Sequence, residues 1–129
     1  MTRKRVLVAD DQDRTLTAVS ALLGESFEVV GLASDGQMAL EAALRLEPDL
    51  LVLDVSMPNM NGIEVAKELK KRINGPRIVF LTVYEDHEVL ANCFAAGALG
   101  YVVKSSMDND LIPAMNEALA GRVFVSHFD

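Results

Sequence analysis

Two kinds of segment alternate along the chain, and this alternation constrains the fold more than any other feature of the sequence. Short runs rich in β-branched and large apolar residues occupy positions 5–9, 27–33, 50–53, 77–81 and 101–103. Between them, apolar residues recur at steps of three or four, as they do on one face of a helix. The runs LLVL (50–53) and IVFL (78–81) are apolar at every position. Such runs are typical of strands that are covered on both faces of a parallel sheet.

Five strands that alternate with five helices predict an α/β fold built from βαβ units with right-handed crossovers. The length of 129 residues suits one domain. We see no internal repeat and no linker, so we expect a single domain over residues 1–129. Because an interior proline removes a backbone donor, Pro113 predicts that the last helix begins near Asn109 or Asp110, or bends there.

Side chains suited to phosphoryl chemistry follow four of the five predicted strands, at the point where each strand ends: Asp10 with Asp11, then Asp54, Thr82 and Lys104. The second strand adds only Ser34, beside Asp35. The carboxyl ends of parallel strands meet at one edge of a sheet, where ligands bind. Three carboxylates close together repel one another unless a cation lies between them, and Mg²⁺ prefers oxygen ligands. A lysine suits a phosphate, and a carboxylate can be a nucleophile that forms an acyl phosphate. We therefore expect a site for Mg²⁺ and a phosphoryl group, with Asp54 as the nucleophile.

Composition excludes several other classes of protein. Twelve Lys and Arg against nineteen Asp and Glu give a net charge of −7, so nucleic acid and anionic membranes should repel this domain. The single cysteine, Cys93, cannot form an internal disulfide or a cysteine-rich zinc site. The apolar runs are far shorter than the roughly 20 residues of a membrane span. The N-terminal residues lack the pattern of a signal peptide, so we expect a cytoplasmic protein.

The chain resembles the receiver domain of two-component response regulators across nearly its whole length. The matching segments are VLVADDQ, ASDGQMALEAA, PDLLVLDVSMPNMNGIEVAKEL, IVFLTVYED and AAGALGYVVKSS. The third segment is the most specific, because it joins the acceptor aspartate to an MPNMNG loop. The closing GRVFVS is similar to receivers of the LuxR/NarL type, which carry a helix-turn-helix output domain.

The resemblance implies a CheY-like, flavodoxin-like fold: a five-stranded parallel sheet in the order 2-1-3-4-5, doubly wound with five helices. It implies that Asp54 accepts a phosphoryl group from a sensor histidine kinase. It also implies that Asp11 ligates Mg²⁺ directly and that Asp10 assists, with Asp54 and the backbone carbonyl of Ser56 as further ligands.

In the same family pattern, Lys104 contacts the phosphoryl oxygens or pairs with Asp54. Thr82 moves its hydroxyl toward the phosphoryl group, and Tyr101 rotates inward. This relay would change the face made by the fourth helix, fifth strand and fifth helix, through which a homodimer could form. The resemblance implies that the domain is not an enzyme and assists only its own phosphorylation and dephosphorylation. We expect a DNA-binding, transcription-regulating output to belong to a further domain.

Two positions depart from the family pattern. Val83 stands where a small residue usually follows the switch threonine, so we expect unusual rates of phosphorylation or hydrolysis. Ser105 replaces the usual proline after Lys104, and a cis bond without proline costs about 2.5–4 kcal/mol, so the family's cis geometry is less secure here.

Three other functional hypotheses compete with that of a phosphorylation-dependent switch. A phosphohydrolase of the haloacid-dehalogenase kind usually has a second Asp two residues after its nucleophile, where this chain has Ser56. A flavodoxin-like cofactor binder needs a phosphate cradle after the first strand, but the loop here is DDQD and no GxGxxG motif is present. A receiver-like binding module without phosphorylation would not need the full set of acids and lysine.

Overall fold

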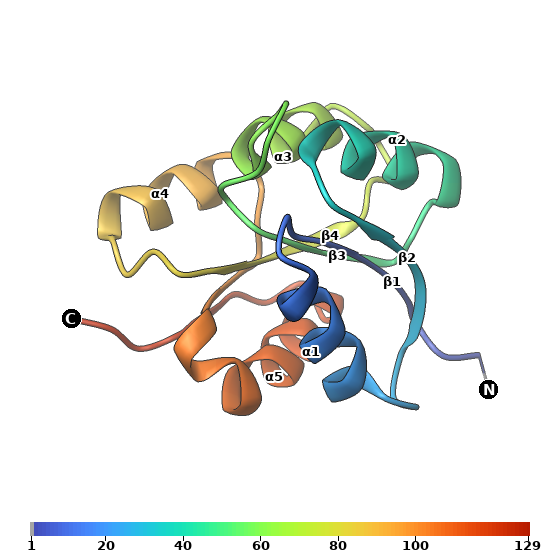
Figure 1. Ribbon diagram of the computed structural model, residues 1–129. Helices are drawn as coiled ribbons and strands as arrows, with labels where there is room; N and C mark the ends of the chain where they lie inside the picture. Colours follow the sequence, from blue (N-terminus) through green and yellow to red (C-terminus); the bar gives the residue numbers. More distant parts are fainter. Residues whose placement is uncertain (1) are drawn as a thin grey trace.

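Six parallel strands form one sheet in the computed structural model, which describes residues 2–129 (Figure 1). Their order is β2-β1-β3-β4-β5-β6. The strands are β1 (Arg5–Ala9), β2 (Glu28–Ala33), β3 (Leu50–Leu53), β4 (Arg77–Thr82), β5 (Gly100–Val103) and β6 (Phe124–Val125). The α/β receiver fold predicted from the sequence is confirmed, and the order 2-1-3-4-5 holds for the first five strands.

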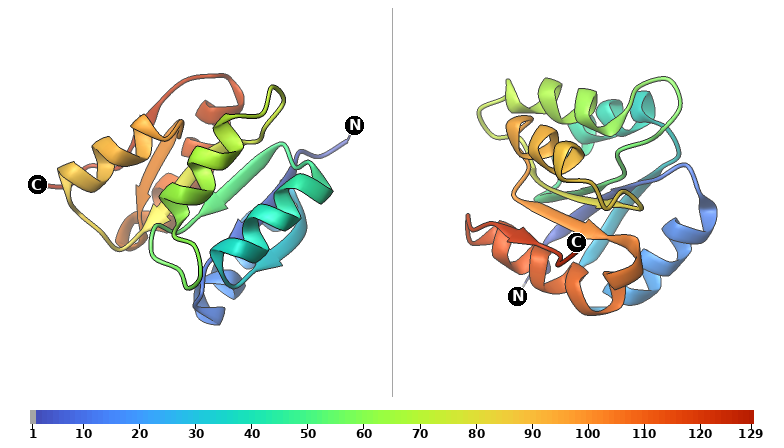
Figure 2. Two further views of the ribbon diagram at one scale, coloured as in Figure 1. Left: turned by 90° about the horizontal axis from the view of Figure 1, so that it is seen from above. Right: turned by 90° about the vertical axis from the view of Figure 1, so that its left-hand side faces the viewer.

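Five α-helices cover the two faces of the sheet. They are α1 (Asp13–Leu23), α2 (Gly36–Leu46), α3 (Gly62–Lys70), α4 (His87–Ala95) and α5 (Met107–Leu119), and a short 3₁₀ helix η1 (Lys104–Ser106) precedes α5. Helices α2, α3 and α4 lie on one face, and α1 and α5 lie on the other (Figures 1 and 2). Among residues 2–129, no helix combines the length and apolar character that crossing a membrane requires.

The two faces of the sheet bury two separate hydrophobic cores, because successive strand residues point in opposite directions. Leu51, Leu53 and Phe80 pack with α2, α3 and α4. Leu50 and Val52 pack with α1 and α5 on the opposite face. All four residues of β3 are buried, as the uninterrupted LLVL run predicts.

The sixth strand corrects the prediction of five. Residues Phe124–Val125 run parallel to β5, with Gly100 opposite Phe124 and Tyr101 opposite Val125. Two residues are too few to produce a periodic pattern in the sequence. The strand exists because the chain returns along β5 after α5, where the backbone of β5 offers unpaired hydrogen-bonding groups.

The start of α5 also differs from the prediction. The helix begins at Met107, so Pro113 lies inside it rather than in its first turn. Pro113 and Asn109 are both exposed. Water can therefore reach this side of the helix, where the Asn109 carbonyl loses its intrahelical donor, and this lowers the cost of the proline.

Candidate functional site

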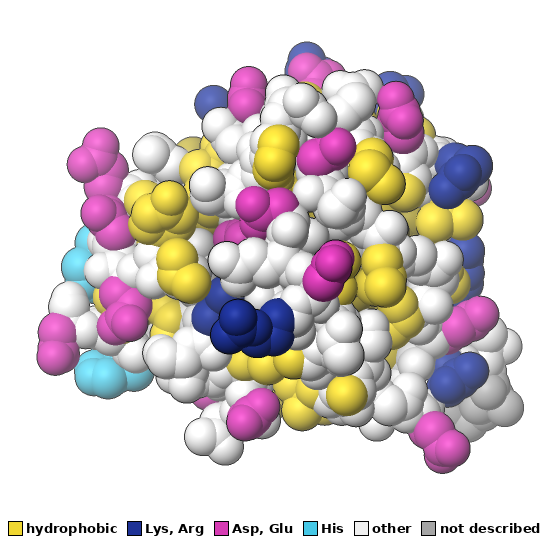
Figure 3. Space-filling model, in the orientation of Figure 1, with side chains coloured by type: hydrophobic (Ala, Val, Ile, Leu, Met, Phe, Trp, Pro, Cys, Tyr) yellow, Lys and Arg dark blue, Asp and Glu magenta, His cyan; other side chains and the backbone are white. Residues whose placement is uncertain are grey.

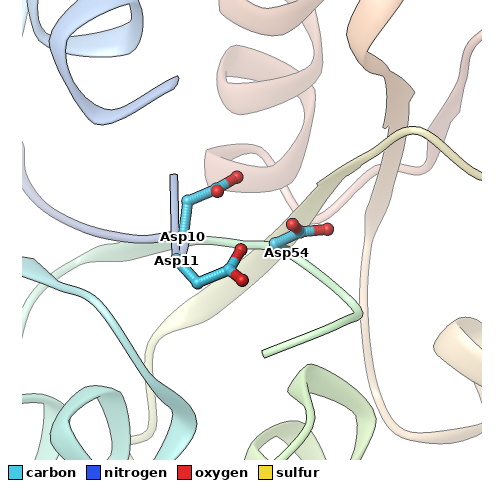
Figure 4. Close-up of side chains that lie close together, drawn as sticks. All are labelled: Asp10, Asp11 and Asp54. Carbon is cyan, nitrogen blue, oxygen red and sulfur yellow. The ribbon is translucent and has the colours of Figure 1, made fainter. Parts of the chain in front are cut away.

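The acidic cluster predicted at the strand ends is assembled by the pairing of β1 with β3. Ala9 and Leu53, the last residues of these strands, lie opposite each other. The Asp54 N–H donates to the Ala9 carbonyl at 3.0 Å, which holds the two strand ends in register. Oxygen atoms from Asp10, Asp11 and Asp54 all lie within 4.8 Å of one another (Figure 4). Asp10 and Asp54 are buried, whereas Asp11 is exposed at the rim.

Lys104 enters this cluster from the end of β5. Its Nζ lies 2.8 Å from Asp10 Oδ2 and 3.3 Å from Asp54 Oδ2, and its side chain is only 16% exposed. One ammonium thus contacts two nearly buried carboxylates. Figure 3 views this edge of the sheet and shows both acidic and basic groups near the centre of the face.

The cluster raises the pKa of two of its members. Burial, followed by repulsion from Asp10, raises the pKa of Asp54 from 3.8 to about 6, against the opposing effects of Lys104 and of the Val55 N–H. Burial alone would lower the pKa of Lys104. The hydrogen bond to Asp10 and the charges of both carboxylates outweigh that effect and raise it.

The donor set fits a hard divalent cation. The cluster holds three carboxylates but one ammonium, which pairs with Asp10 and Asp54, so two negative charges remain unbalanced. Burial, and next the charge of Asp10, raise the pKa of Asp54, so holding its negative charge here is costly in the absence of a cation. Carboxylate oxygens are the ligands that Mg²⁺ prefers, and a divalent charge would neutralise the excess. Ser56 lies exposed in the loop that follows Asp54.

Backbone hydrogen bonds orient the two buried carboxylates. The Val55 N–H donates to Asp54 Oδ1 at 2.7 Å, and the Gln12 N–H donates to Asp10 Oδ1 at 2.8 Å. Each acid therefore keeps Oδ2 for Lys104. These backbone partners carry no residue-type signal, so the sequence could not have revealed them.

Thr82 and Tyr101 are both fully buried and are joined through Tyr84. The Tyr84 N–H donates to Thr82 Oγ1 at 3.2 Å. The Tyr101 hydroxyl donates to the Tyr84 carbonyl at 2.7 Å, so Tyr101 occupies the inward position. Burial raises the pKa of Tyr101, with smaller contributions from Cys93 and Asp86. Tyr84 is thus a link between the two predicted switch residues that sequence reasoning missed.

The loop between β3 and α3 depends on a glycine beneath Asp54. A Cβ on Gly62 would lie 1.9 Å from the Asp54 carbonyl oxygen, which leaves no room for a side chain. The Gly62 N–H donates to the Val55 carbonyl at 2.7 Å. Asn61 and Glu64 then begin α3 with a reciprocal capping box. This packing explains the NG pair of the MPNMNG loop.

The comparisons with known proteins agree with this geometry. A family model described as "Response regulator receiver domain" matches residues 6–116. The nitrate/nitrite response regulator protein NarL of Escherichia coli K12 is 36% identical over 123 residues, which cover 94% of this chain and 57% of NarL. The receiver domain of a putative NarL from Mycobacterium tuberculosis superposes with a TM-score of 0.89 at 29% identity, covering 95% of this chain and all of that one.

A LuxR-family two-component response regulator from Aurantimonas sp. SI85-9A1 also has a TM-score of 0.89, at 29% identity over 95% of this chain and 89% of that chain. The resemblance to receivers of the LuxR/NarL type is thereby confirmed. The chain spans only 57% of the length of NarL. Family model, relatives and fold concur, and the chain belongs to the response regulator receiver domains.

Proposed function

We propose that this domain is a phosphorylation-dependent switch, in which Asp54 accepts a phosphoryl group from the phosphohistidine of a sensor histidine kinase. The observation that carries the proposal is the set of three carboxylates and Lys104 at one edge of the sheet. The Val55 N–H holds Asp54 Oδ1, so Oδ2 is the oxygen placed to attack phosphorus. An O–P bond forms as the P–N bond of the phosphohistidine breaks, and the leaving imidazole recovers a proton.

Asp10, Asp11, Asp54 and the carbonyl of Ser56 would hold Mg²⁺, which supplies positive charge to the phosphoryl oxygens. Lys104 adds a second positive charge from the β5 side. Once Asp54 carries the phosphoryl group as an acyl phosphate, its Oδ2 is no longer a free anion. Lys104 then exchanges that partner for a phosphoryl oxygen, while its 2.8 Å contact with Asp10 keeps the ammonium at the site.

The relay follows from the Thr82–Tyr84–Tyr101 contacts. If Thr82 turns its hydroxyl toward the phosphoryl group, the Tyr84 N–H loses its acceptor. Tyr84 then shifts with Thr82, and its carbonyl, which accepts from the Tyr101 hydroxyl, holds Tyr101 in the inward position. A local charge change thereby alters the face made by α4, β5 and α5. As the resemblance to receivers of the LuxR/NarL type implies, that face would control a DNA-binding output domain or form a homodimer.

The proposal keeps two further expectations from the sequence. The domain turns over no other substrate, so it is not an enzyme in the usual sense. Its acidic surface binds no nucleic acid directly.

Phosphorylation by acetyl phosphate with Mg²⁺ tests the proposal. We expect the intact mass to rise by one phosphoryl group and the Phos-tag mobility to fall. Asp54→Asn should remain unmodified, whereas Asp108→Asn, an exposed acid on α5, should behave as wild type. Val83, which is 64% exposed, offers a rate test: Val83→Ala should speed the reaction without loss of stability. An unmodified wild type, or equal modification of Asp54→Asn, contradicts the proposal.

A further inference from the structure

The end of the chain, residues 124–129, lies along β5 and reaches α4 (Figures 1 and 2). Beyond the strand pairing of β6, the Phe124 N–H donates to the Leu99 carbonyl at 3.0 Å. The Ser126 N–H donates to the carbonyl of Tyr101 at 2.8 Å. The backbone of this segment is therefore bonded directly to the strand that carries the switch tyrosine.

Ser126 anchors the segment at the point where β5 ends. It is only 2% exposed. Its Oγ accepts from the Val103 N–H at 3.2 Å and donates to Asp110 Oδ2 at 2.7 Å. Val103 immediately precedes Lys104, and Asp110 lies in the first turn of α5. One buried hydroxyl thus joins the C-terminal segment to the strand that places the active-site lysine.

Phe128 packs beside the Tyr101 ring. Their ring centroids are 6.0 Å apart. On its other side, Phe128 stacks against His87 at the start of α4, at 4.7 Å and an interplanar angle of 24°. Phe128 is half-buried and packs on the core cluster that contains the fully buried Tyr101. An outward turn of Tyr101 on this side would require Phe128 to leave.

We propose that residues 126–129 form a latch that closes over the inward Tyr101, so that docking of this segment is coupled to occupancy of the phosphoryl site. The inference rests on the proposed function, because the phosphoryl group is what biases Thr82 and Tyr101 inward. Ser126 supplies the polar attachment, and Phe128 supplies the apolar one. Coupling is reciprocal: if phosphorylation tightens the latch, loss of the latch weakens binding at the phosphoryl site by the same factor.

Beryllofluoride with Mg²⁺, a mimic of the phosphoryl group, serves as the probe for an NMR test. A titration of backbone amides near Asp54 measures its affinity. Hydrogen exchange of the Phe124 and Ser126 amides measures docking of the latch. In wild type, the probe should slow exchange of both amides about fivefold or more. Phe128→Ala and Ser126→Ala should each weaken the probe's binding by the same factor. His127→Ala, an exposed neighbour in the same segment, should leave it unchanged.

The outcomes separate the two proposals. If the wild type fails to bind beryllofluoride, the proposed function falls, and the coupling falls with it. If the wild type binds but both latch variants keep its affinity, or exchange at Phe124 and Ser126 does not change, the latch is wrong while the switch stands. If the circular dichroism spectrum shows that Phe128→Ala does not fold, Ser126→Ala alone tests the coupling, because it removes only one hydroxyl.

Discussion

Replacing Asp54 with Asn should make the metal-free protein more stable at pH 8, although it removes the proposed phosphoacceptor. The cause is the cost of keeping a charged carboxylate at this position. Its side chain is only 8% exposed. Burial, and next the charge of Asp10, outweigh the attraction of Lys104 and raise the pKa of Asp54 from 3.8 to about 6. Asn has nearly the same shape and can still accept the hydrogen bond from Val55, but it carries no charge.

The size of the effect follows from proton linkage. The folded protein holds the Asp54 proton more tightly than the unfolded chain does. The contribution of Asp54 to the free energy of unfolding is therefore largest below pH 3.8, declines as the pH rises, and is smallest above about pH 6. A difference of about two pKa units corresponds to about 3 kcal/mol. Asn avoids this loss, so its advantage should be about 2–3 kcal/mol at pH 8 and mostly vanish near pH 4.

Urea unfolding followed by circular dichroism, in EDTA at pH 8 and pH 4, measures this difference. Glu25→Gln, which removes one exposed negative charge from the turn after α1, controls for the net charge. Added Mg²⁺ should stabilise wild type more than Asp54→Asn and narrow the gap, because only wild type offers all three carboxylates. The reasoning is refuted if Asp54→Asn is no more stable than wild type at pH 8, or if its advantage is as large at pH 4.

Three further substitutions test other parts of the structure. Asp11→Asn should weaken Mg²⁺ binding about tenfold or more, because ligand charge sets affinity in oxygen-donor sites. Calorimetric titration measures the Mg²⁺ affinity, and an unchanged affinity would exclude Asp11 as a ligand. Gly62→Ala should lower the free energy of unfolding by about 2–3 kcal/mol, since its Cβ would meet the Asp54 carbonyl oxygen at 1.9 Å. If this variant unfolds in urea at the same concentration as wild type, the loop tolerates a side chain and the prediction is wrong. Arg77→Met should lower the free energy of unfolding by about 1 kcal/mol in the same assay, because Arg77 donates to the Ala118 carbonyl at the end of α5 at 2.9 Å. An unchanged free energy of unfolding would mean that water replaces this hydrogen bond at no cost.

The elements of the fold were predictable because their signals are local. The runs LLVL and IVFL identify strands covered on both faces, and the apolar steps between them identify helices. The sixth strand was not predictable, since Phe124–Val125 has no period of its own. The start of α5 was misplaced because Pro113 suggested a boundary. The exposure of that residue, which makes an interior proline tolerable, is a tertiary property.

Some helix ends are also decided by distant parts of the chain. Arg5 donates to the carbonyls of Leu46 and Glu47 at the end of α2. Lys70 donates to the Ala95 carbonyl at the end of α4. These cations interact favourably with the negative end of each helix dipole. Each donor is separated from its acceptor by 25 to 42 residues, so no local pattern could predict the pairing.

The sequence by itself determined which residues stand at the ends of the strands, because a polar residue that follows an apolar run is visible without coordinates. Parallel pairing then makes those ends converge, whatever the details of the fold. Only the tertiary structure decided how the groups meet: Lys104 between two carboxylates, Tyr84 between Thr82 and Tyr101, and Phe128 over the switch ring. Such contacts depend on register, side-chain orientation and burial. These properties arise only when segments far apart in the sequence pack together, and they also set the raised pKa of Asp54.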